Sequence, residues 1–262
     1  MHKTILVLYA ALVLSQALSI SAKRGILFPW DTIPGDLAQF NQQNCPKARY
    51  YANWESWPHR EAPRNLEFMA MARTPADIDK LYQFMGNNNA KTLLLFNEPD
   101  LPGPTQLNVE TAVQLWRQHA VHFRNTRGVQ LASPAITSDR SRGLPWLRKF
   151  MEQTRDVPPN YITLHYYGSS GTDFKNYVRD VYNEFRLPII IHEVASTDSN
   201  TESVKGFMWD VTTWCEQQTY IKAVFWFCAS RTANIKENLA SSAMLYPNGQ
   251  RTDSAYKFCY DW

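Results

Sequence analysis

The sequence lacks the short motifs that identify several large classes of enzyme. No Gly-rich phosphate loop of the Walker or dinucleotide-binding type follows any apolar run, and no Gly-x-Ser-x-Gly turn is present. A phosphate-bearing cofactor and a Ser-His-Asp nucleophile are therefore not indicated. The four cysteines are not spaced as Cys-x-x-Cys, the pattern typical of a zinc site. We expect neither a cofactor nor a metal.

The chain also lacks the features that would divide it into domains. No Gly/Ser-rich or Pro-rich linker, block of like charge or low-complexity tract interrupts it. One domain is the simpler interpretation for a chain of this length. The sequence contains no Asn-x-Ser/Thr sequon, so it gives no sign of N-glycosylation.

Residues 1–22 have the pattern of a secretory signal peptide. Lys3 precedes an apolar run over residues 5–14, and the segment ends in Ser21 and Ala22. The apolar run is too short and too interrupted for a membrane-spanning helix, which needs about 20 largely apolar residues. The dibasic pair Lys23-Arg24 offers a second processing position. We expect a secreted protein, extracellular or in a cell wall, whose single domain covers residues 25–262.

Positive and negative charges are nearly balanced. The formal net charge is +3, from 27 Lys and Arg against 24 Asp and Glu. Processing after Arg24 would remove Lys3, Lys23 and Arg24 and no acidic residue, which leaves a net charge of zero. Bulk charge therefore gives no argument for a nucleic acid or an anionic membrane as partner.

The even number of cysteines favours disulfides in a secreted chain. The four are Cys45, Cys215, Cys228 and Cys259, and three connectivities are open. We expect one disulfide, with a second as an alternative and buried free thiols as the opposite case.

Short apolar runs alternate with segments of helical spacing along most of the chain. The runs predict strands at residues 25–30, 48–54, 67–72, 92–96, 129–132, 161–166, 188–192 and 222–227. The helical segments lie at residues 76–85, 109–123, 144–154, 174–185 and 203–217. Residues 55–66 contain two prolines and no helical face, so the second crossover is expected to be a loop.

This alternation predicts parallel strands joined by right-handed crossovers. The run Ile189-Ile190-Ile191 suits a strand that is buried on both faces. Eight such units predict an α/β fold, a single (β/α)8 TIM barrel. A doubly wound open sheet is the alternative, and the absence of a Gly-rich loop weakens it.

Acidic residues follow two of the predicted strands. The fourth strand ends in Asn97-Glu98-Pro99-Asp100 and the seventh in His192-Glu193-Val194. Because the carboxyl ends of barrel strands form the active face, we expect Glu98 and Glu193 to point into one cleft. Two carboxylates suit glycosidic bond cleavage, one as a protonated acid with an elevated pKa and the other ionised, as nucleophile or base.

Aromatic and imidazole side chains at other strand ends suit a sugar, whose C–H faces pack on aromatic rings. The candidates are Trp30, Trp54, His165, Tyr167 and Trp226. His165 and Tyr167 share a strand face, as do Ile191 and Glu193, whereas His192 is expected to face the helices. His165 has a buried core histidine as its alternative, Trp226 a packing role, and Asp100 a role in stabilising the turn or helix start after Pro99.

A resemblance to a known family rests on several of these segments. The strand ends "FNEPD" (96–100) and "IIIHEVAS" (189–196) resemble those of clan A retaining glycoside hydrolases. Together with "RGILFPW" (24–30), "YYANWE" (50–55), "SPA" (133–135), "ITLHYYG" (162–168) and "AVFWF" (223–227), they are similar to glycoside hydrolase family 128, whose members are small β-1,3-glucan hydrolases.

The resemblance implies a role for each matching residue. Glu98 is implied as the acid/base, Glu193 as the nucleophile and Asn97 as the partner of the sugar 2-hydroxyl. Tyr167 is placed to hold the nucleophile, Trp226 to form the floor of the site, and Trp30 and Trp54 to form platforms further out. The implied protein is a monomeric, retaining and endo-acting β-1,3-glucanase, although the residues alone do not decide between endo and exo action.

Two other functions remain open from the sequence. One is a protein of the same fold that binds β-glucan without hydrolysing it, which the presence of both carboxylates disfavours. The other is a clan A hydrolase acting on β-mannan, xylan or β-1,4-glucan. Loops such as residues 55–66 would decide the substrate, and their shape does not follow from the sequence.

Overall fold

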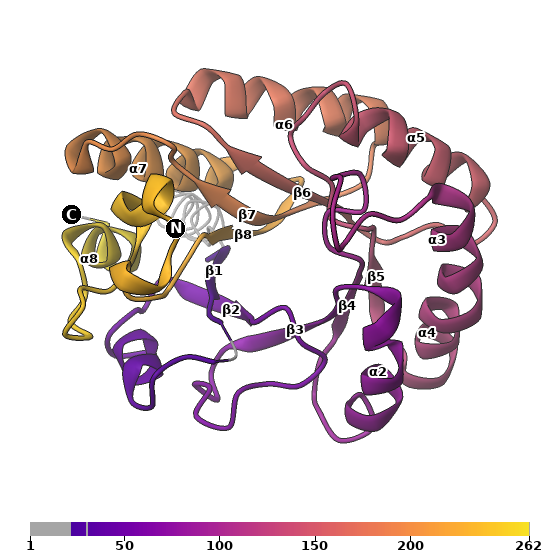
Figure 1. Cartoon of the computed structure of the whole chain (residues 1–262), viewed down its shortest axis with the longest axis horizontal. Coiled ribbons are helices and arrows are strands. Elements are labelled where there is room, and N and C mark those ends of the chain that lie inside the picture. The colour runs from indigo at the N-terminus through magenta and orange to yellow at the C-terminus, as the bar shows by residue number, and fades with distance from the viewer. Residues whose placement is uncertain (1–21, 30, 262) are drawn as a thin grey trace, which may run out of the picture.

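Eight parallel strands form the centre of the fold in a computed structural model that describes residues 22–29 and 31–261 (Figure 1). They are β1 (Arg24–Leu27), β2 (Ala48–Ala52), β3 (Glu67–Ala72), β4 (Thr92–Leu95), β5 (Gln130–Ala132), β6 (Ile162–Tyr167), β7 (Ile189–Ala195) and β8 (Ile221–Trp226). The predicted signal segment, apart from Ala22, and the candidate Trp30 lie outside the described residues.

The strands pair in the order β5-β4-β3-β2-β1-β8-β7-β6. β1 pairs with both β2 and β8, so the first and last strands of the chain are neighbours. The remaining gap, between β5 and β6, is spanned by the isolated bridges Ala132 to Tyr161 and Ile136 to Leu164. The ring is therefore nearly closed, and the predicted TIM barrel is confirmed.

Helices cover the outside of the ring (Figure 1). They are α2 (Ile78–Phe84), α3 (Val109–Leu115), the π-helical turn η3 (Trp116–Ala120), α4 (Val121–Arg127), α5 (Gly143–Gln153), α6 (Gly171–Phe185), α7 (Thr201–Gln217) and α8 (Asp253–Tyr260). Short 3-10 turns are η1 (Asp36–Phe40), η2 (Pro75–Asp77), η4 (Thr232–Asn234) and η5 (Glu237–Ser242). Each of the five predicted helical segments is present, and the helix predicted over 109–123 runs through α3, η3 and α4.

Two departures from the expected repeat concern the crossovers. The β2–β3 connection contains no helix, as the prolines of residues 55–66 predicted. Helix α8 was not predicted, because its eight residues give too short a window for a clear helical period.

Among residues 22–29 and 31–261, no helix is both long enough and apolar enough to cross a bilayer.

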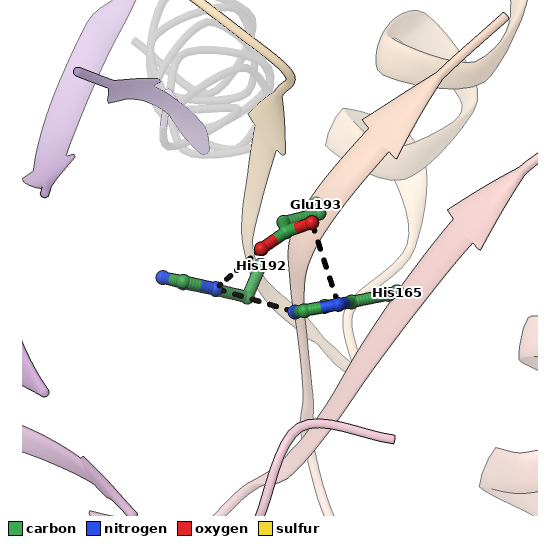
Figure 2. A group of neighbouring side chains, drawn as sticks. All are labelled: His165, His192 and Glu193. Atoms are coloured by element: carbon green, nitrogen blue, oxygen red, sulfur yellow. Dashed lines mark hydrogen bonds and ion pairs between the residues drawn. The ribbon is translucent and has the colours of Figure 1, made fainter. Parts of the chain in front are cut away.

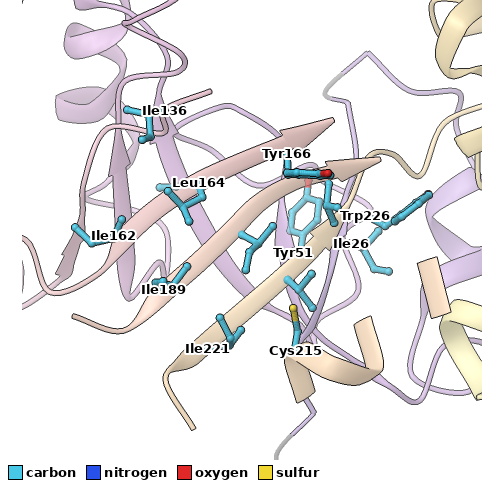
Figure 3. Packing of buried hydrophobic residues seen from close by; sticks show 14 of the residues in the cluster. Ile26, Tyr51, Ile136, Ile162, Leu164, Tyr166, Ile189, Cys215, Ile221 and Trp226 are labelled. Carbon is cyan, nitrogen blue, oxygen red and sulfur yellow. The ribbon is translucent and has the colours of Figure 1, made fainter. Parts of the chain in front are cut away.

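Alternate residues of the strands pack into two separate cores. The barrel interior is filled by Leu27, Tyr50, Ala52, Met69, Met71, Leu94, Ala132, Ala135, Ile190, Ala223, Phe225 and Cys228. A Cβ on Gly25 would lie 2.2 Å from the Phe225 ring, so the glycine makes room for that ring at the centre. The larger core lies between strands and helices, where Ile26, Leu164, Ile189 and Trp226 pack (Figure 3).

The beginning of β1 is tied to the last helix by a buried ion pair. Arg24 is fully buried, and its guanidinium donates to Glu216 Oε1 at 3.0 Å, to Glu216 Oε2 at 2.9 Å, and to Asp261 Oδ1. It also donates to the carbonyl of Phe258 in α8. The guanidinium is therefore satisfied on several sides, as a buried charge requires.

A disulfide between Cys45 and Cys259 joins the segment before β2 to α8. Because it closes a loop with a sequence separation of 214, it restricts the unfolded chain strongly. Cys215 and Cys228 are buried free thiols. The expected single disulfide is thus present, and the alternative of two is not.

The Arg24 cluster predicts a large effect of a single substitution. Arg24→Met keeps much of the side-chain volume but removes the guanidinium that pairs with Glu216 and Asp261, of which Asp261 keeps its ion pair with Lys47. We expect a loss of about 3 kcal/mol in the free energy of unfolding. Urea denaturation measures it. Arg49→Met, on an exposed position of β2, is the matched control and should change stability by less than about 0.5 kcal/mol. Equal effects of the two substitutions would contradict the structural role of Arg24.

Candidate active site

Glu98 stands just beyond β4 on a backbone that bends away from the extended form. Phe96 and Glu98 have φ angles of 72° and 46°, in the left-handed region that non-glycine residues seldom adopt. Hydrogen bonds hold this bend: Glu98 N donates to Ala135 O at 2.8 Å, and Asn97 N donates to Arg73 O at 2.9 Å. The loops after β3 and β5 thus fix a strained segment that carries the carboxylate.

Glu193 lies in β7 where the strand contains an extra residue. Leu164 of β6 pairs with Ile191, but the next residue, His165, pairs with Glu193. His192 is therefore a bulge, and it breaks the simple alternation of side chains. Ile191 packs in the outer core, whereas His192 packs against Phe225 of the barrel interior.

Two expectations about β7 are wrong for this reason. Ile191 and Glu193 do not share a face, and His192 does not face the helices. A bulge leaves no mark on the period-two pattern of apolar residues, so His192 was missed as a member of the site. A polar pair, His192-Glu193, at the end of an otherwise apolar strand was the available signal.

One imidazole contacts both carboxylates. His165 Nδ1 lies 2.9 Å from Glu98 Oε1 and 3.4 Å from Glu193 Oε2. The His165 side chain is fully buried, while Glu98 keeps 18% of its side-chain surface exposed and Glu193 keeps 6%. Figure 2 shows Glu193 above the two imidazoles, with His192 on the left and His165 on the right. The structure therefore brings together the two glutamates that follow the fourth and the seventh predicted strands.

Two further donors orient the Glu193 carboxylate. Trp54 Nε1 donates to Oε1 at 2.7 Å, and the Tyr167 hydroxyl donates to Oε2. Trp54 has a φ of 59°, a third positive value near the site. Donors from β6 and from the loop after β2 thus fix the Glu193 carboxylate in one orientation.

The pKa of Glu98 is lowered, whereas an elevated pKa was expected for the acid of the pair. Burial alone would raise the pKa of Glu98, but the hydrogen bond and charge of His165, with a contribution from Lys236, hold that pKa below its ordinary value. Burial disfavours the charged form of His165, yet Glu193, Glu98 and Asp100 together raise the pKa of its imidazole. The structure thus favours an imidazolium between carboxylates.

The aromatic side chain that β8 contributes to the site is Phe227, not Trp226. The Phe227 ring lies 5.7 Å from that of Trp54 and 5.6 Å from that of Tyr167. Trp226 is fully buried in the outer core, where it packs on Phe207 of α7 and donates to Ser242 O. Since Phe225 points inward, alternation turns Trp226 outward, so it does not form the floor of the site.

Two polar residues near Glu98 have distinct surroundings. Asn97 Oδ1 is buried and has no hydrogen-bond partner among the described residues, so an acceptor is available beside the acid. Asp100 does not start a helix: it accepts from Thr137 N at 3.1 Å and from the Thr137 hydroxyl. Asp100 therefore links the loop after β4 to the loop after β5.

His165, His192 and Glu193 are close enough for their ligand atoms to meet at one metal ion. Their hydrogen bonds explain the cluster without one. His165 Nδ1 is already engaged by both carboxylates, and His192 Nδ1 lies 3.4 Å from His165 Nε2. His192 Nε2 has no partner among the described residues, but the three nitrogens that face one another or the carboxylates are already engaged, and we assign no metal to this group.

The comparisons with known proteins agree with this geometry. A family model described as glycosyl hydrolase catalytic core matches residues 28–258. The alkali-sensitive linkage protein 1 of Schizosaccharomyces pombe is 26% identical over 218 residues, which are 80% of this chain and 39% of that protein. This chain thus spans well under half of the length of that relative.

Solved structures similar to this chain include members of glycoside hydrolase family 128. An exo-β-1,3-glucanase from Aureobasidium namibiae has a TM-score of 0.84 at 23% identity and covers 92% of this chain and 96% of its own. An exo-β-1,3-glucanase from Cryptococcus neoformans has a TM-score of 0.79 at 25% identity, over 91% and 98% of the two chains. An endo-β-1,3-glucanase from Amycolatopsis mediterranei, in complex with laminaripentaose, has a TM-score of 0.73 at 24% identity, over 91% and 100%.

The fold, the paired carboxylates and the family match define a glycosyl hydrolase. The chain belongs to the glycosyl hydrolase catalytic core family. The resemblance to glycoside hydrolase family 128 that the sequence motifs indicated is confirmed.

The Trp54 contact predicts a specific loss of activity. Trp54→Phe keeps an aromatic ring but removes the N–H that donates to Glu193, and a hydrogen bond to a charged group contributes about 1.5 to 3 kcal/mol. We expect kcat/KM on a β-glucan to fall roughly 10- to 100-fold.

Trp116→Phe is the matched control for this experiment. The Trp116 indole in η3 donates to Val157 O at 2.9 Å, in the connection from α5 to β6 and not in a loop that carries either carboxylate. We expect this variant to retain its activity. Equal activity of the two variants would show that the Trp54 hydrogen bond does not assist the reaction.

Proposed function

We propose that this protein is a secreted glycoside hydrolase that cleaves β-1,3-glucan with retention of configuration. Glu98 acts as acid/base and Glu193 as nucleophile. The single observation that carries the proposal is the contact of His165 Nδ1 with both carboxylates, at 2.9 Å and 3.4 Å. This contact places an acid with an exposed edge beside a second carboxylate held by fixed donors.

The separation of the carboxylates supports the retaining route. Glu98 Oε1 and Glu193 Oε2 both contact one nitrogen, so these two oxygens are no farther apart than the sum of those contacts. Such close oxygens favour the separation of about 5 to 5.5 Å between carboxyl groups of retaining enzymes over the roughly 6.5 to 9.5 Å that leaves room for water in inverting ones. In the proposed reaction Glu193 attacks the anomeric carbon directly and forms a glycosyl ester.

The donors around Glu193 suit a nucleophile. The Trp54 indole and the Tyr167 hydroxyl donate to the two oxygens of the carboxylate and orient it toward the substrate. Asn97, whose buried oxygen has no partner among the described residues, is the proposed acceptor for the 2-hydroxyl of the sugar in the cleavage subsite.

The substrate assignment is supported by the similar solved structures. Those from Amycolatopsis mediterranei contain laminaripentaose, laminarihexaose and laminaritriose. Trp54 and Phe227 line this site with aromatic surface that suits the C–H face of a glucose unit. Exo- and endo-acting enzymes both occur among the relatives, and we propose endo action by a monomer, in line with the sequence resemblance.

Secretion is part of the proposal, with cleavage after Ala22. The Cys45–Cys259 disulfide suits an oxidising compartment. Arg24 is buried in β1 and bonded to Glu216 and Asp261, so cleavage after Arg24 would remove an interaction of the folded protein. The mature domain therefore begins at Lys23, and its site of action is extracellular or in a cell wall.

Laminarin hydrolysis tests the catalytic pair. Glu98→Gln and Glu193→Gln each remove an ionisable group while keeping its shape, and we expect kcat to fall at least about a thousandfold in both. Glu110→Gln, exposed on α3, is the matched control and should act like wild type. Unchanged sugar release in either of the first two variants would refute its assigned role, and binding of laminarin without hydrolysis by wild type would indicate a glucan-binding protein.

Early products test the stereochemistry and the mode of attack. Proton NMR during the first minutes should show the β-anomer appearing before mutarotation, because two displacements restore the configuration. Chromatography of the same samples should show a ladder of oligosaccharides. An initial α-anomer would exclude Glu193 as nucleophile, and glucose as sole early product would show exo action. Mannan, xylan and β-1,4-glucan are the control substrates, and they should be left intact.

A further inference from the structure

His165 has a place in the site that the roles of the two glutamates do not explain. It is fully buried, and its Nδ1 contacts Glu98 Oε1 and Glu193 Oε2. An imidazole nitrogen without a proton would direct its lone pair at these oxygens, which repel it when ionised. One proton therefore lies between His165 Nδ1 and Glu98 Oε1, bound to either the nitrogen or the oxygen.

His192 determines which nitrogen of His165 exchanges this proton. His192 Nδ1 lies 3.4 Å from His165 Nε2. Burial, with the neighbouring His165, holds the pKa of His192 well below its ordinary value, so His192 stays neutral. A neutral His192 accepts from His165 Nε2–H through its Nδ1. His165 thus keeps its Nε2 proton throughout, and only Nδ1 gains or loses one.

The other titratable groups around the pair do not compete for the proton. The groups that face His165 and Glu98 are Asp100 after β4, Tyr167 on β6, His192 and Glu193 on β7, and Lys236 after β8, while Cys228 interacts with Glu193 and Tyr167. Burial raises the pKa of the Tyr167 hydroxyl and of the Cys228 thiol, so both stay protonated near neutral pH. The carboxylates favour an imidazolium, and Lys236 favours ionised Glu98.

We propose that His165 is a positioning residue that stores the proton that Glu98 delivers as acid, in the glycoside hydrolysis proposed above. The proton moves from His165 Nδ1 to Glu98 Oε1 along the 2.9 Å contact. Imidazolium and carboxylate become imidazole and carboxylic acid, and the total charge of the site is unchanged.

The stored proton is returned at the end of each cycle. Glu98 gives its proton to the leaving oxygen as the glycosidic C–O bond breaks and Glu193 forms the ester bond. In the second step the Glu98 carboxylate takes a proton from the attacking water, whose oxygen replaces Glu193 on the anomeric carbon. That proton passes back to His165 Nδ1, which leaves both glutamates ionised, and the net reaction is hydrolysis.

This arrangement extends activity to higher pH than a glutamic acid of ordinary pKa would allow. The pair of Glu98 and His165 retains one proton until the imidazolium itself is titrated, and the macroscopic pKa belongs to the pair. With an ordinary pKa of about 6.5 for histidine and about 4.3 for glutamate, the two groups differ by roughly two pH units.

The pH dependence of kcat/KM on laminarin tests the proposal. His165→Asn keeps an N–H donor near the Nδ1 position but cannot hold an additional proton. We expect its alkaline limb to move down by about one to two pH units, with activity near pH 5 kept within about tenfold of wild type. The control is His122→Asn, on an exposed position of α4, which should leave the limb unmoved. A loss of activity by the same factor at every pH would overturn the proposal.

A measurement on the wild-type protein keeps the test independent of whether His165→Asn folds. Nitrogen NMR of protein with labelled histidine should show His165 with protons on both ring nitrogens at about pH 6.5, while His192 is neutral. A neutral His165 at that pH would overturn the stored proton. If wild type does not hydrolyse laminarin, the proposed function fails, whereas hydrolysis with an unshifted His165→Asn profile refutes only the role of His165.

Discussion

The contact of one buried imidazole with two carboxylates is the interaction on which the site depends. His165 neutralises part of the charge that would otherwise keep Glu98 and Glu193 apart. Like charges at such short range in a buried site would disfavour the ionised form of one or both. With the imidazole between them, the two carboxylates can lie close together, and Glu98 keeps an exposed edge for a substrate. The donors Trp54 and Tyr167 then orient the Glu193 carboxylate, whose repulsion from Glu98 is reduced by His165.

Much of the fold could be predicted from the sequence because the barrel repeats one simple pattern. The runs Leu93-Leu94-Leu95 in β4 and Ile189-Ile190-Ile191 in β7 are apolar at successive positions, as expected of strands buried on both faces, and the helices between strands show clear periods. The two glutamates could be paired because parallel strands bring their carboxyl ends to one edge. The bonds of Arg24 with Glu216 and Asp261 could not be predicted, since they join residues that are close only after the ring has closed.

The errors in the site arose where a local detail changes the direction of a side chain. The bulge at His192 turns two successive residues toward the barrel interior, and no periodic argument contains that information. The sequence did not show which residues of β8 point into the barrel. Phe225 points inward, so Phe227, just after the strand, reaches the site and Trp226 does not. The size of an aromatic residue at a strand end therefore says less about whether it reaches the site than the direction in which its side chain points. The lowered pKa of Glu98 depends on a histidine 67 positions away along the chain.

The pairing of β1 with β8 has a consequence for how the chain is made. During synthesis β1 emerges almost 200 residues before β8, so one edge of the growing sheet stays unpaired for most of that time. Arg24 lacks the acids of residues 216 and 261 for the same interval. The ring therefore cannot close before β8 has been made, and until then the nascent chain has an open edge that is prone to association. A cell that produces this protein needs to keep that edge covered.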